Sequence, residues 1–160
     1  DEAGLSATLA APFATLGIAS DGRVVAGVRY LPVRTPAVTP RDRIAERAVR
    51  ELERWLDDPQ FRFTVPLAPA ATAFRQRVRE AIAAIPVGES RTYAEVARTV
   101  RSAARAVGGA CGANTIALIV PCHRVVGSRG ALGGFMHGTQ DDAIAIKRWL
   151  LVHEGYRFGR

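Results

Sequence analysis

The chain has 160 residues, 48% of them hydrophobic, and its 22 basic against 15 acidic side chains give a formal net charge of +7. This length fits one compact domain or two small lobes, and the hydrophobic content excludes a disordered chain. Apolar runs stay below the roughly 18 residues that a membrane helix needs, and no secretory signal is visible at the start, so we expect no membrane partner.

Arginine supplies nearly all of the positive charge, since Lys147 is the only lysine. Guanidinium groups bind phosphates through two parallel hydrogen bonds and stack on bases, so this composition points to a nucleic-acid partner. A solvated basic surface in a protein from a GC-rich genome explains the same composition. Charge alone leaves both interpretations open.

The two cysteines are too few for a secreted disulfide scaffold, and free thiols indicate a reducing, cytoplasmic location. A structural zinc site needs about four ligands at regular spacing, and the chain has no Cys-x-x-Cys pair. We therefore expect no metal and no other cofactor. The candidate ligands are Cys111, Cys122, His123, His137 and His153.

The N-terminal third predicts a small sheet followed by a helix. Two apolar runs, residues 14–20 and 23–31, are joined by Asp21-Gly22, which is typical of a hairpin turn. Residues 41–56 place their apolar side chains on one helical face, with arginine and glutamate outside. Alternation over residues 61–65 predicts a further strand.

A proline- and alanine-rich linker at residues 66–71 separates this lobe from the rest of the chain. We therefore predict an α+β fold of two parts. Residues 1–67 form an α/β lobe with a hairpin sheet and a helix. Residues 68–160 form a mostly helical domain that contains a helix-turn-helix.

The predicted helix-turn-helix follows a helix that Pro86 and Gly88 terminate. Thr92 and Glu95 form a capping box that starts a short helix through residue 100. Ser102 is in position to cap a second one over residues 103–109, after a turn of a few residues. Small side chains on this second helix allow close approach of a DNA backbone. An ordinary tightly packed helix pair remains the alternative.

An apolar run at residues 116–120 predicts a buried extended segment that leads into Pro121, Cys122 and His123. Residues 127–138 hold five glycines and predict a binding loop. A final amphipathic helix is expected over residues 141–153, ended by Gly155 in the left-handed conformation.

Cys122 is the candidate nucleophile. A cysteine attacks as its thiolate, which a histidine held by a carboxylate can generate. His123 is adjacent, but neighbouring side chains of an extended segment face opposite ways, so a bridging water or a turn at Pro121 is needed. Glu154 is the first choice of carboxylate, and the alternatives Asp141, Asp142 and Glu95 stay open.

Structural roles are the alternative for each of these residues. Most lone cysteines are buried structural thiols, and His123 fits an ordinary hydrogen-bonded loop histidine. For Cys111, within the small-residue helix, the structural role is the better interpretation.

The segment Pro-Cys-His-Arg-Val-Val at residues 121–126 resembles the active-site signature of the O6-alkylguanine-DNA alkyltransferases. The resemblance covers about residues 72–157, while the N-terminal lobe matches in general layout only. The matching residues, in order and spacing, are Phe74, Val78, Ile85, Pro86, Gly88, Tyr93, residues 104–108, Asn114, residues 149–151 and residues 153–155.

This resemblance implies DNA repair by direct reversal, with single-turnover transfer of an alkyl group from O6-alkylguanine, and from O4-alkylthymine as a further substrate, to Cys122. His123 acts as base through a bound water, and Glu154 holds the histidine. Tyr93 helps turn the target nucleotide out and contacts the leaving guanine. Asn114 braces the turn before the active-site segment.

The implied partner is double-stranded DNA, bound by a monomer that presents its second short helix to the minor groove. Arg105 fills the gap that the flipped nucleotide leaves. The other implied DNA contacts are Ala104, Ala106, Gly108, Tyr93 and Arg124, and the implied base pocket comprises Val125, Phe135, Met136 and Ala117.

The chain departs from the family pattern in several places. The turn at residues 101–102 is about two residues shorter and lacks the common proline. The loop before Lys147 is longer by several residues. The size of the pocket for the alkylated base is therefore not determined by the resemblance. The other departures are Thr115 and Ala117 in place of prolines, Arg79 in place of tryptophan, and His137 in place of a small residue.

Three other functions are alternatives to alkyl transfer. A non-catalytic sensor of alkylated DNA is the main alternative, although such relatives replace the acceptor cysteine. A transcriptional regulator requires a second DNA-binding module with zinc-ligand cysteines, so we expect a stand-alone repair protein or an excised C-terminal portion. A papain-like hydrolase requires a distant catalytic histidine with oxyanion donors, and their lack in this sequence counts against that function.

Overall fold

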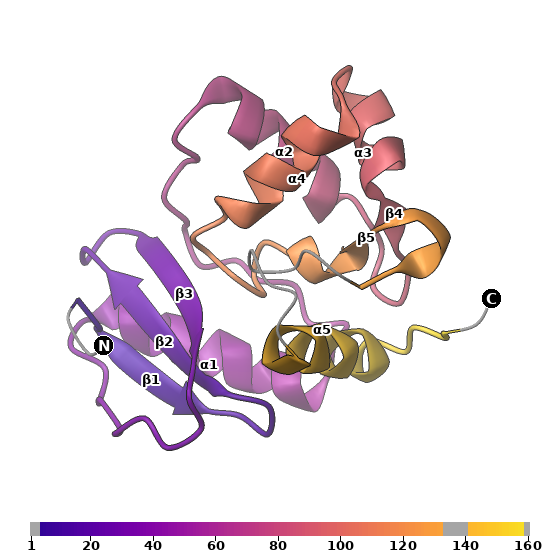
Figure 1. The fold of residues 1–160 in the computed structure, drawn as a ribbon. Helices are drawn as coiled ribbons and strands as arrows, with labels where there is room; N and C mark the ends of the chain where they lie inside the picture. The colour runs from indigo at the N-terminus through magenta and orange to yellow at the C-terminus, as the bar shows by residue number, and fades with distance from the viewer. Residues whose placement is uncertain (1–3, 133–140, 159–160) are drawn as a thin grey trace. The chain divides into compact units, whose positions relative to one another are not determined.

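The computed structural model describes residues 4–132 and 141–158. The chain divides into two compact units, which are described separately below. The first consists of Asp1–Ala68 with Thr115–Ile119, and the second of Pro69–Asn114 with Val120–Arg160 (Figure 1). The division at residues 67 and 68 made from sequence stays a prediction.

The first unit contains an antiparallel sheet in the order β1 (Ala7–Ala10), β2 (Thr15–Ser20) and β3 (Val25–Leu31). The predicted hairpin is confirmed, because β2 pairs with β3 along its length. Its turn is stabilised by the Asp21 carboxylate, which accepts hydrogen bonds from the backbone N–H groups of Arg23 and Val24 at 2.8 and 2.9 Å. Gly22 supplies the positive φ of 88° that the turn requires.

Helix α1 (Arg43–Asp57) packs against all three strands. Asp42 caps it by accepting a hydrogen bond from the Ala45 backbone at 2.8 Å. One face of α1 forms the core of this unit with the inward side of the sheet, whereas Ile44, Val49 and Leu56 of the predicted stripe are only half-buried. The fully buried members are Leu16, Ile18, Ala45, Ala48, Leu52 and Trp55.

The strand predicted over residues 61–65 is wrong, since these residues adopt no regular strand. The buried carboxylate of Glu51 accepts hydrogen bonds from the backbone N–H groups of Thr64 at 2.8 Å and Val65 at 3.0 Å. These donors therefore satisfy a side chain instead of a neighbouring strand. Pairing resumes beyond them, in an isolated bridge between Val25 and Leu67.

Residues 116–120 were expected to be extended, and this is also wrong beyond Ile116. Ile116 forms an isolated bridge with Val28 in the first unit. The chain then turns, with Leu118 at a φ of 68° and the Ile119 N–H donating to the Ala117 carbonyl at 2.7 Å. The segment is buried at Ile116 and Leu118, as expected.

The second unit is mostly helical, as predicted, and it also contains one short parallel strand pair. Among the described residues, no helix is both long and apolar enough to cross a membrane. The helices are α2 (Ala73–Ala83), α3 (Tyr93–Val100), α4 (Ala104–Gly112) and α5 (Asp141–His153), with the 3-10 turns η1 (Cys122–Arg124) and η2 (Ser128–Gly130) and the strands β4 (Arg91–Thr92) and β5 (Val125–Val126).

Helices α3 and α4 pack against each other as the two helices of the predicted helix-turn-helix. The capping box at Thr92 and Glu95 is confirmed by both of its hydrogen bonds. The cap predicted at Ser102 is wrong, because the N-cap is Ala103 and has no side-chain hydrogen bond. Arg101 ends α3 in the left-handed conformation, so the turn is short without a glycine or proline.

The end of α5 shows how a local signal positions a site residue. Gly155 has a φ of 89°. Its N–H donates to the Val152 carbonyl, and the Tyr156 N–H donates to the Leu151 carbonyl, both at 2.9 Å. These bonds form a Schellman motif, which fixes Glu154 at the helix terminus.

Candidate active site

Cys122 opens the 3-10 turn η1 and is 7% exposed. Pro121, with φ −82° and ψ 61°, turns the chain into this segment, and the Arg124 N–H closes the turn on the Pro121 carbonyl at 2.9 Å. Cys122 therefore does not lie on an extended strand. Successive side chains on a 3-10 turn diverge by about 120°, so Cys122 and His123 still point in different directions.

His123 is 1% exposed and bonds to Glu154. Its Nε2 lies 2.9 Å from Oε2 of Glu154. Among the carboxylates considered from sequence, Glu95 and Asp142 are exposed, and the side chain of Asp141 lies outside the described residues. The structure therefore brings Glu154, and neither Glu95 nor Asp142, to the histidine.

Arg124 holds the same carboxylate from a second direction. Its Nε and Nη2 donate to Oε1 and Oε2 of Glu154 at 2.9 and 2.8 Å, in a two-pronged arrangement. Its Nη1 donates to the Ile85 carbonyl at 2.8 Å. The guanidinium is thus engaged inside the second unit, and the DNA contact suggested for Arg124 stays a prediction.

The ionisation of Glu154 and His123 determines which ring nitrogen of His123 carries the proton. Burial raises the pKa of Glu154, but hydrogen bonds from His123 and Arg124 outweigh it and lower that pKa to about 2. Burial lowers the pKa of His123, although Glu154 opposes the shift. A neutral imidazole facing an ionised carboxylate carries its proton on Nε2, which leaves Nδ1 as a free acceptor. Nδ1 is buried without a hydrogen-bond partner among the described residues.

The neighbouring Cys111 thiol and burial raise the pKa of the Cys122 thiol well above its usual value, although Asn114 and Lys147 oppose the shift. Asn114 also donates from Nδ2 to the Val120 carbonyl at 3.4 Å, just ahead of the active-site segment. Cys111 lies in the last turn of α4 and is half-buried. Its place beside Cys122 was not foreseen, because small residues around it favoured a structural role.

Lys147 is a second residue that sequence reasoning missed. It is fully buried on α5 and donates from Nζ to the Val125 carbonyl at 2.6 Å. Burial lowers its pKa to about 8, although Cys111 and Cys122 oppose the shift. A signal was available in its spacing, since Lys147 continues the buried stripe of Ala143, Leu150 and Leu151.

Tyr93, at the start of α3, completes this cluster. The Nζ atom of Lys147 lies 5.9 Å from the centre of the Tyr93 ring. Burial raises the pKa of Tyr93 to about 12, with further contributions from Cys111 and Cys122. The phenol therefore keeps its proton at neutral pH and is able to donate it.

The exposed face of α4 carries the predicted DNA contacts. Arg105, Ala104 and Ala106 are exposed near its N-terminus. A Cβ atom placed on Gly108 would meet nothing within 4 Å, so the surface there is open as well as small. This face fits close approach of a DNA backbone.

The remaining predicted pocket residues are only partly described. Val125 is fully buried, and its carbonyl is engaged by Lys147. Ala117 belongs to the first unit, where its N–H donates to the Val28 carbonyl at 3.0 Å. Phe135 and Met136 lie outside the described residues. Within residues 4–132 and 141–158, no group of three side chains suited to a metal ion is found.

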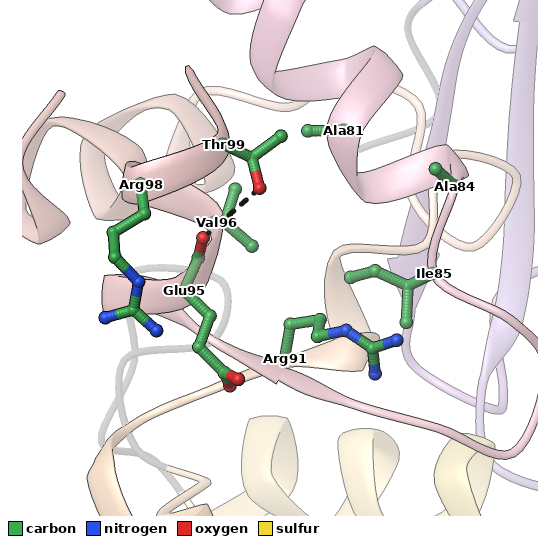
Figure 2. A pocket seen from close by; sticks show the side chains of 8 residues that line it. All are labelled: Ala81, Ala84, Ile85, Arg91, Glu95, Val96, Arg98 and Thr99. Atoms are coloured by element: carbon green, nitrogen blue, oxygen red, sulfur yellow. Dashed lines mark hydrogen bonds between the residues drawn. The ribbon is translucent and has the colours of Figure 1, made fainter. Parts of the chain in front are cut away.

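A cavity of about 410 Å³ lies between α2 and α3 and does not include Cys122. Figure 2 shows Arg91, Glu95 and Arg98 among its lining side chains, with the Thr99 hydroxyl donating to the Glu95 carbonyl at 3.4 Å. Its wall is otherwise largely apolar, from Ala81, Ala84, Ile85 and Val96. We assign no ligand to it.

Residues 73–156 match the family model described as 6-O-methylguanine DNA methyltransferase, DNA binding domain. The chain belongs to this family. It is 41% identical over 157 residues to the methylated-DNA–protein-cysteine methyltransferase of Mycobacterium tuberculosis, which covers 94% of this chain and 92% of the relative.

A longer relative and a solved structure are also similar to this chain. The regulatory protein ada of Salmonella typhimurium is 40% identical over 111 residues, which are 68% of this chain and only 31% of that longer relative. The crystal structure of Mycobacterium tuberculosis OGT in complex with DNA matches with a TM-score of 0.76 and 37% identity, over 92% of this chain and 90% of that one. The α+β fold predicted from sequence is therefore confirmed.

Proposed function

We propose that this member of the 6-O-methylguanine DNA methyltransferase family repairs DNA by direct reversal, with Cys122 as the acceptor of an alkyl group from O6 of guanine. The observation that carries this assignment is the buried hydrogen bond between Glu154 and His123, the residue that directly follows Cys122. Among the described residues, Cys122 is the cysteine that lies next to a histidine held by a carboxylate. Thiolate formation needs this arrangement.

His123 acts as the base in this proposal. Glu154 holds the imidazole proton on Nε2, so Nδ1 is available to accept a proton. Because the side chains of Cys122 and His123 point in different directions on η1, the thiol proton passes to Nδ1 through a bridging water. The ionised Glu154 stabilises the imidazolium that results.

The transfer is a displacement at the alkyl carbon. The Cys122 sulfur forms the new carbon–sulfur bond while the bond from that carbon to O6 breaks, and the electron pair stays on guanine. Tyr93 donates its hydroxyl proton to the departing base and regains a proton from solvent. The thioether at Cys122 is stable, so each molecule reacts once.

Access to O6 requires that the nucleotide leave the stack, because the alkyl carbon lies inside the duplex. Extrusion costs a few kcal/mol of stacking, which a side chain inserted into the gap offsets. Arg105 is exposed among small residues at the start of α4, and we assign it this role. Ala104, Ala106 and Gly108 allow the minor-groove backbone to approach, and Asn114 braces the chain before Cys122.

The finer properties of the reaction remain predictions. Double-stranded DNA with O6-methylguanine is the proposed substrate, with O4-alkylthymine as a further one. The protein acts as a monomer and without a cofactor. Because both cysteines are free, we expect a cytoplasmic location.

Counting turnovers tests this function. The protein is mixed with excess duplex containing O6-methylguanine, and restored guanine is counted per protein molecule. One guanine per molecule supports a single-use acceptor, and many per molecule contradict it. Tight binding to the lesion without any restored guanine indicates a damage sensor instead.

A further inference from the structure

The ammonium group of Lys147 connects the segment after the proposed acceptor to the proposed proton donor. Lys147 lies on α5 and is fully buried. Its Nζ atom donates to the Val125 carbonyl at 2.6 Å and lies over the ring of Tyr93, 5.9 Å from the ring centre. The proposed reaction steps use neither of these two contacts.

The short parallel strand pair brings the two contacts together. Strand β5, which contains Val125, pairs with β4. Tyr93 directly follows β4, and the turn that Cys122 opens leads directly into β5. The hydrogen bond to the Val125 carbonyl therefore holds the ammonium where the acceptor segment and the proton donor lie close to each other.

Proton donation by Tyr93 is costly in these surroundings. Burial raises the pKa of Tyr93 to about 12, because a charged phenolate is poorly solvated inside the protein. Transfer of the phenol proton to guanine produces this phenolate at the moment when the base departs. A group that stabilises the phenolate therefore makes Tyr93 a better acid for this step.

We propose that Lys147 is a positioning residue for proton donation, whose ammonium is held against the Tyr93 ring and stabilises the negative charge that Tyr93 acquires when it protonates the departing guanine. The proposal rests on the proposed function, with Cys122 as the acceptor and Tyr93 as the proton donor. Lys147 does not touch the substrate and acts through Tyr93.

The attraction between Lys147 and Tyr93 changes during the reaction. A cation over a neutral aromatic ring is attracted only modestly. A phenolate carries a full negative charge that is partly delocalised into the ring, and opposite charges attract strongly where water is excluded. The contact is therefore stronger in the transition state than in the ground state, which is the condition for raising a rate. The pKa of Lys147 is about 8, so its ammonium form predominates at neutral pH.

The proton balance of the step is complete without a further reactant. The Cys122 thiolate forms the bond to the alkyl carbon, and the bond from that carbon to O6 breaks with its electron pair on guanine. The O–H bond of Tyr93 breaks, its proton passes to guanine, and its electron pair stays on the phenolate. Lys147 keeps its proton throughout, and Tyr93 regains one from solvent.

A second methyl donor separates this role from an effect of Lys147 on the thiols. Lys147 also interacts with Cys111 and Cys122, so removal of its charge affects thiolate formation as well. Methyl iodide delivers the same methyl group to Cys122, but iodide leaves without needing a proton. An effect on the thiolate slows both reagents, whereas an effect through Tyr93 slows only transfer from guanine.

Two neutral variants are measured with both donors at neutral pH. Lys147→Gln keeps an N–H donor for the Val125 carbonyl but loses the charge, and Lys147→Met keeps the length of the side chain without either. In both we expect methyl transfer from duplex O6-methylguanine, at saturating DNA in a single turnover, to slow about tenfold more than transfer from methyl iodide. Peptide mapping locates the methyl group on Cys122, and unfolding curves verify that each variant is folded.

The charge-keeping variant and a double variant complete the design. Lys147→Arg retains a cation, so it should lack the extra tenfold loss. Tyr93→Phe removes the proton donor and should itself slow transfer from the duplex. When Lys147→Gln is added to Tyr93→Phe, the two methyl donors should be slowed by equal factors, because the group through which Lys147 acts is gone.

The proposal is overturned if the neutral variants slow both methyl donors equally, or if the extra loss persists when Tyr93 is replaced by phenylalanine. It is also overturned if Tyr93→Phe repairs the duplex as fast as the wild type. Failure of the proposed function gives a different result: wild-type Cys122 then accepts methyl from methyl iodide and none from the duplex.

Discussion

The Nε2 atom of His123 lies 2.9 Å from Oε2 of Glu154, where the two residues are 1% and 5% exposed. The same carboxylate receives two hydrogen bonds from Arg124. Glu154 therefore serves two neighbours, one chemical and one structural. Its replacement should affect both alkyl transfer and folding stability, by separable routes.

Glu154→Gln is the first test of this arrangement. Glutamine keeps the shape but not the charge, so an imidazolium at His123 is no longer stabilised, and we expect alkyl transfer to slow by about 10²-fold or more. The variant also leaves the buried Arg124 without a carboxylate, which should lower the free energy of unfolding by about 3 kcal/mol. Single-turnover kinetics and denaturant unfolding measure the two effects.

The double variant Glu154→Gln with Arg124→Met is the matched control. It removes the unpaired charge, so part of the stability should return while the transfer rate stays low. DNA affinity should remain near normal in both variants. Loss of DNA binding in Glu154→Gln would show that Glu154 is structural, and an unchanged rate would exclude His123 as the base.

The stability of the fold at acid pH should depend on the same carboxylate. The pKa of Glu154 is lowered from 4.5 to about 2 in the folded protein. The stabilisation is therefore complete above about pH 4.5 and is lost as the pH falls toward 2, by up to about 3 kcal/mol. Unfolding free energies between pH 5 and pH 3 should fall less steeply in Glu154→Gln. Equal slopes would contradict the low pKa.

Lys147 should add a second pH dependence of stability, at alkaline pH. Its pKa is lowered from 10.5 to about 8, so above pH 8 the unfolded chain binds more protons than the folded one. The wild type should therefore gain stability, up to about 3 kcal/mol, as the pH rises from 8 to 10.5. Lys147→Met should lack this gain, as measured by denaturant unfolding at pH 8 and 10.

The same variant should also slow alkyl transfer at neutral pH, because the positive charge near Cys111 and Cys122 is lost. Raising the pH should recover part of that rate, since more thiolate then forms. A neutral-pH rate equal to that of the wild type would remove Lys147 from the account of the site.

Local signals in the sequence predicted the elements that carry the site. The Asp21-Gly22 turn, the Thr92–Glu95 capping box and the Gly155 helix end each depend on residues within a few positions of one another. Such contacts can be read without knowledge of the fold. The orientation of Glu154 follows from one of them, because Gly155 ends α5 at that point.

Features that depend on distant contacts could not be predicted in the same way. The expected strand at residues 61–65 failed because Glu51, more than ten residues earlier, takes its backbone donors. The meeting of Cys111 with Cys122 depends on the fold of the chain between them, where Leu118 adopts a positive φ. A side chain that accepts hydrogen bonds from remote backbone groups produces no periodic pattern in the sequence.

Arg105→Ala tests the DNA-binding face. Only a duplex needs the gap to be filled, so repair of double-stranded DNA should slow by about 10- to 100-fold while reaction with free O6-alkylguanine base changes little. Arg75→Ala, which removes an exposed arginine from α2, is the matched control for charge. Equal losses with duplex and free base would contradict the inserted-arginine role.

The most direct test of the central claim is the intact mass of the protein after mixing with duplex DNA that contains O6-methylguanine, followed by peptide mapping. We predict the addition of one methyl group per molecule, located on Cys122 in the wild type and in Cys111→Ala, and no addition in Cys122→Ala. An unchanged mass in the wild type, or a methyl group mapped to any residue other than Cys122, would contradict the account.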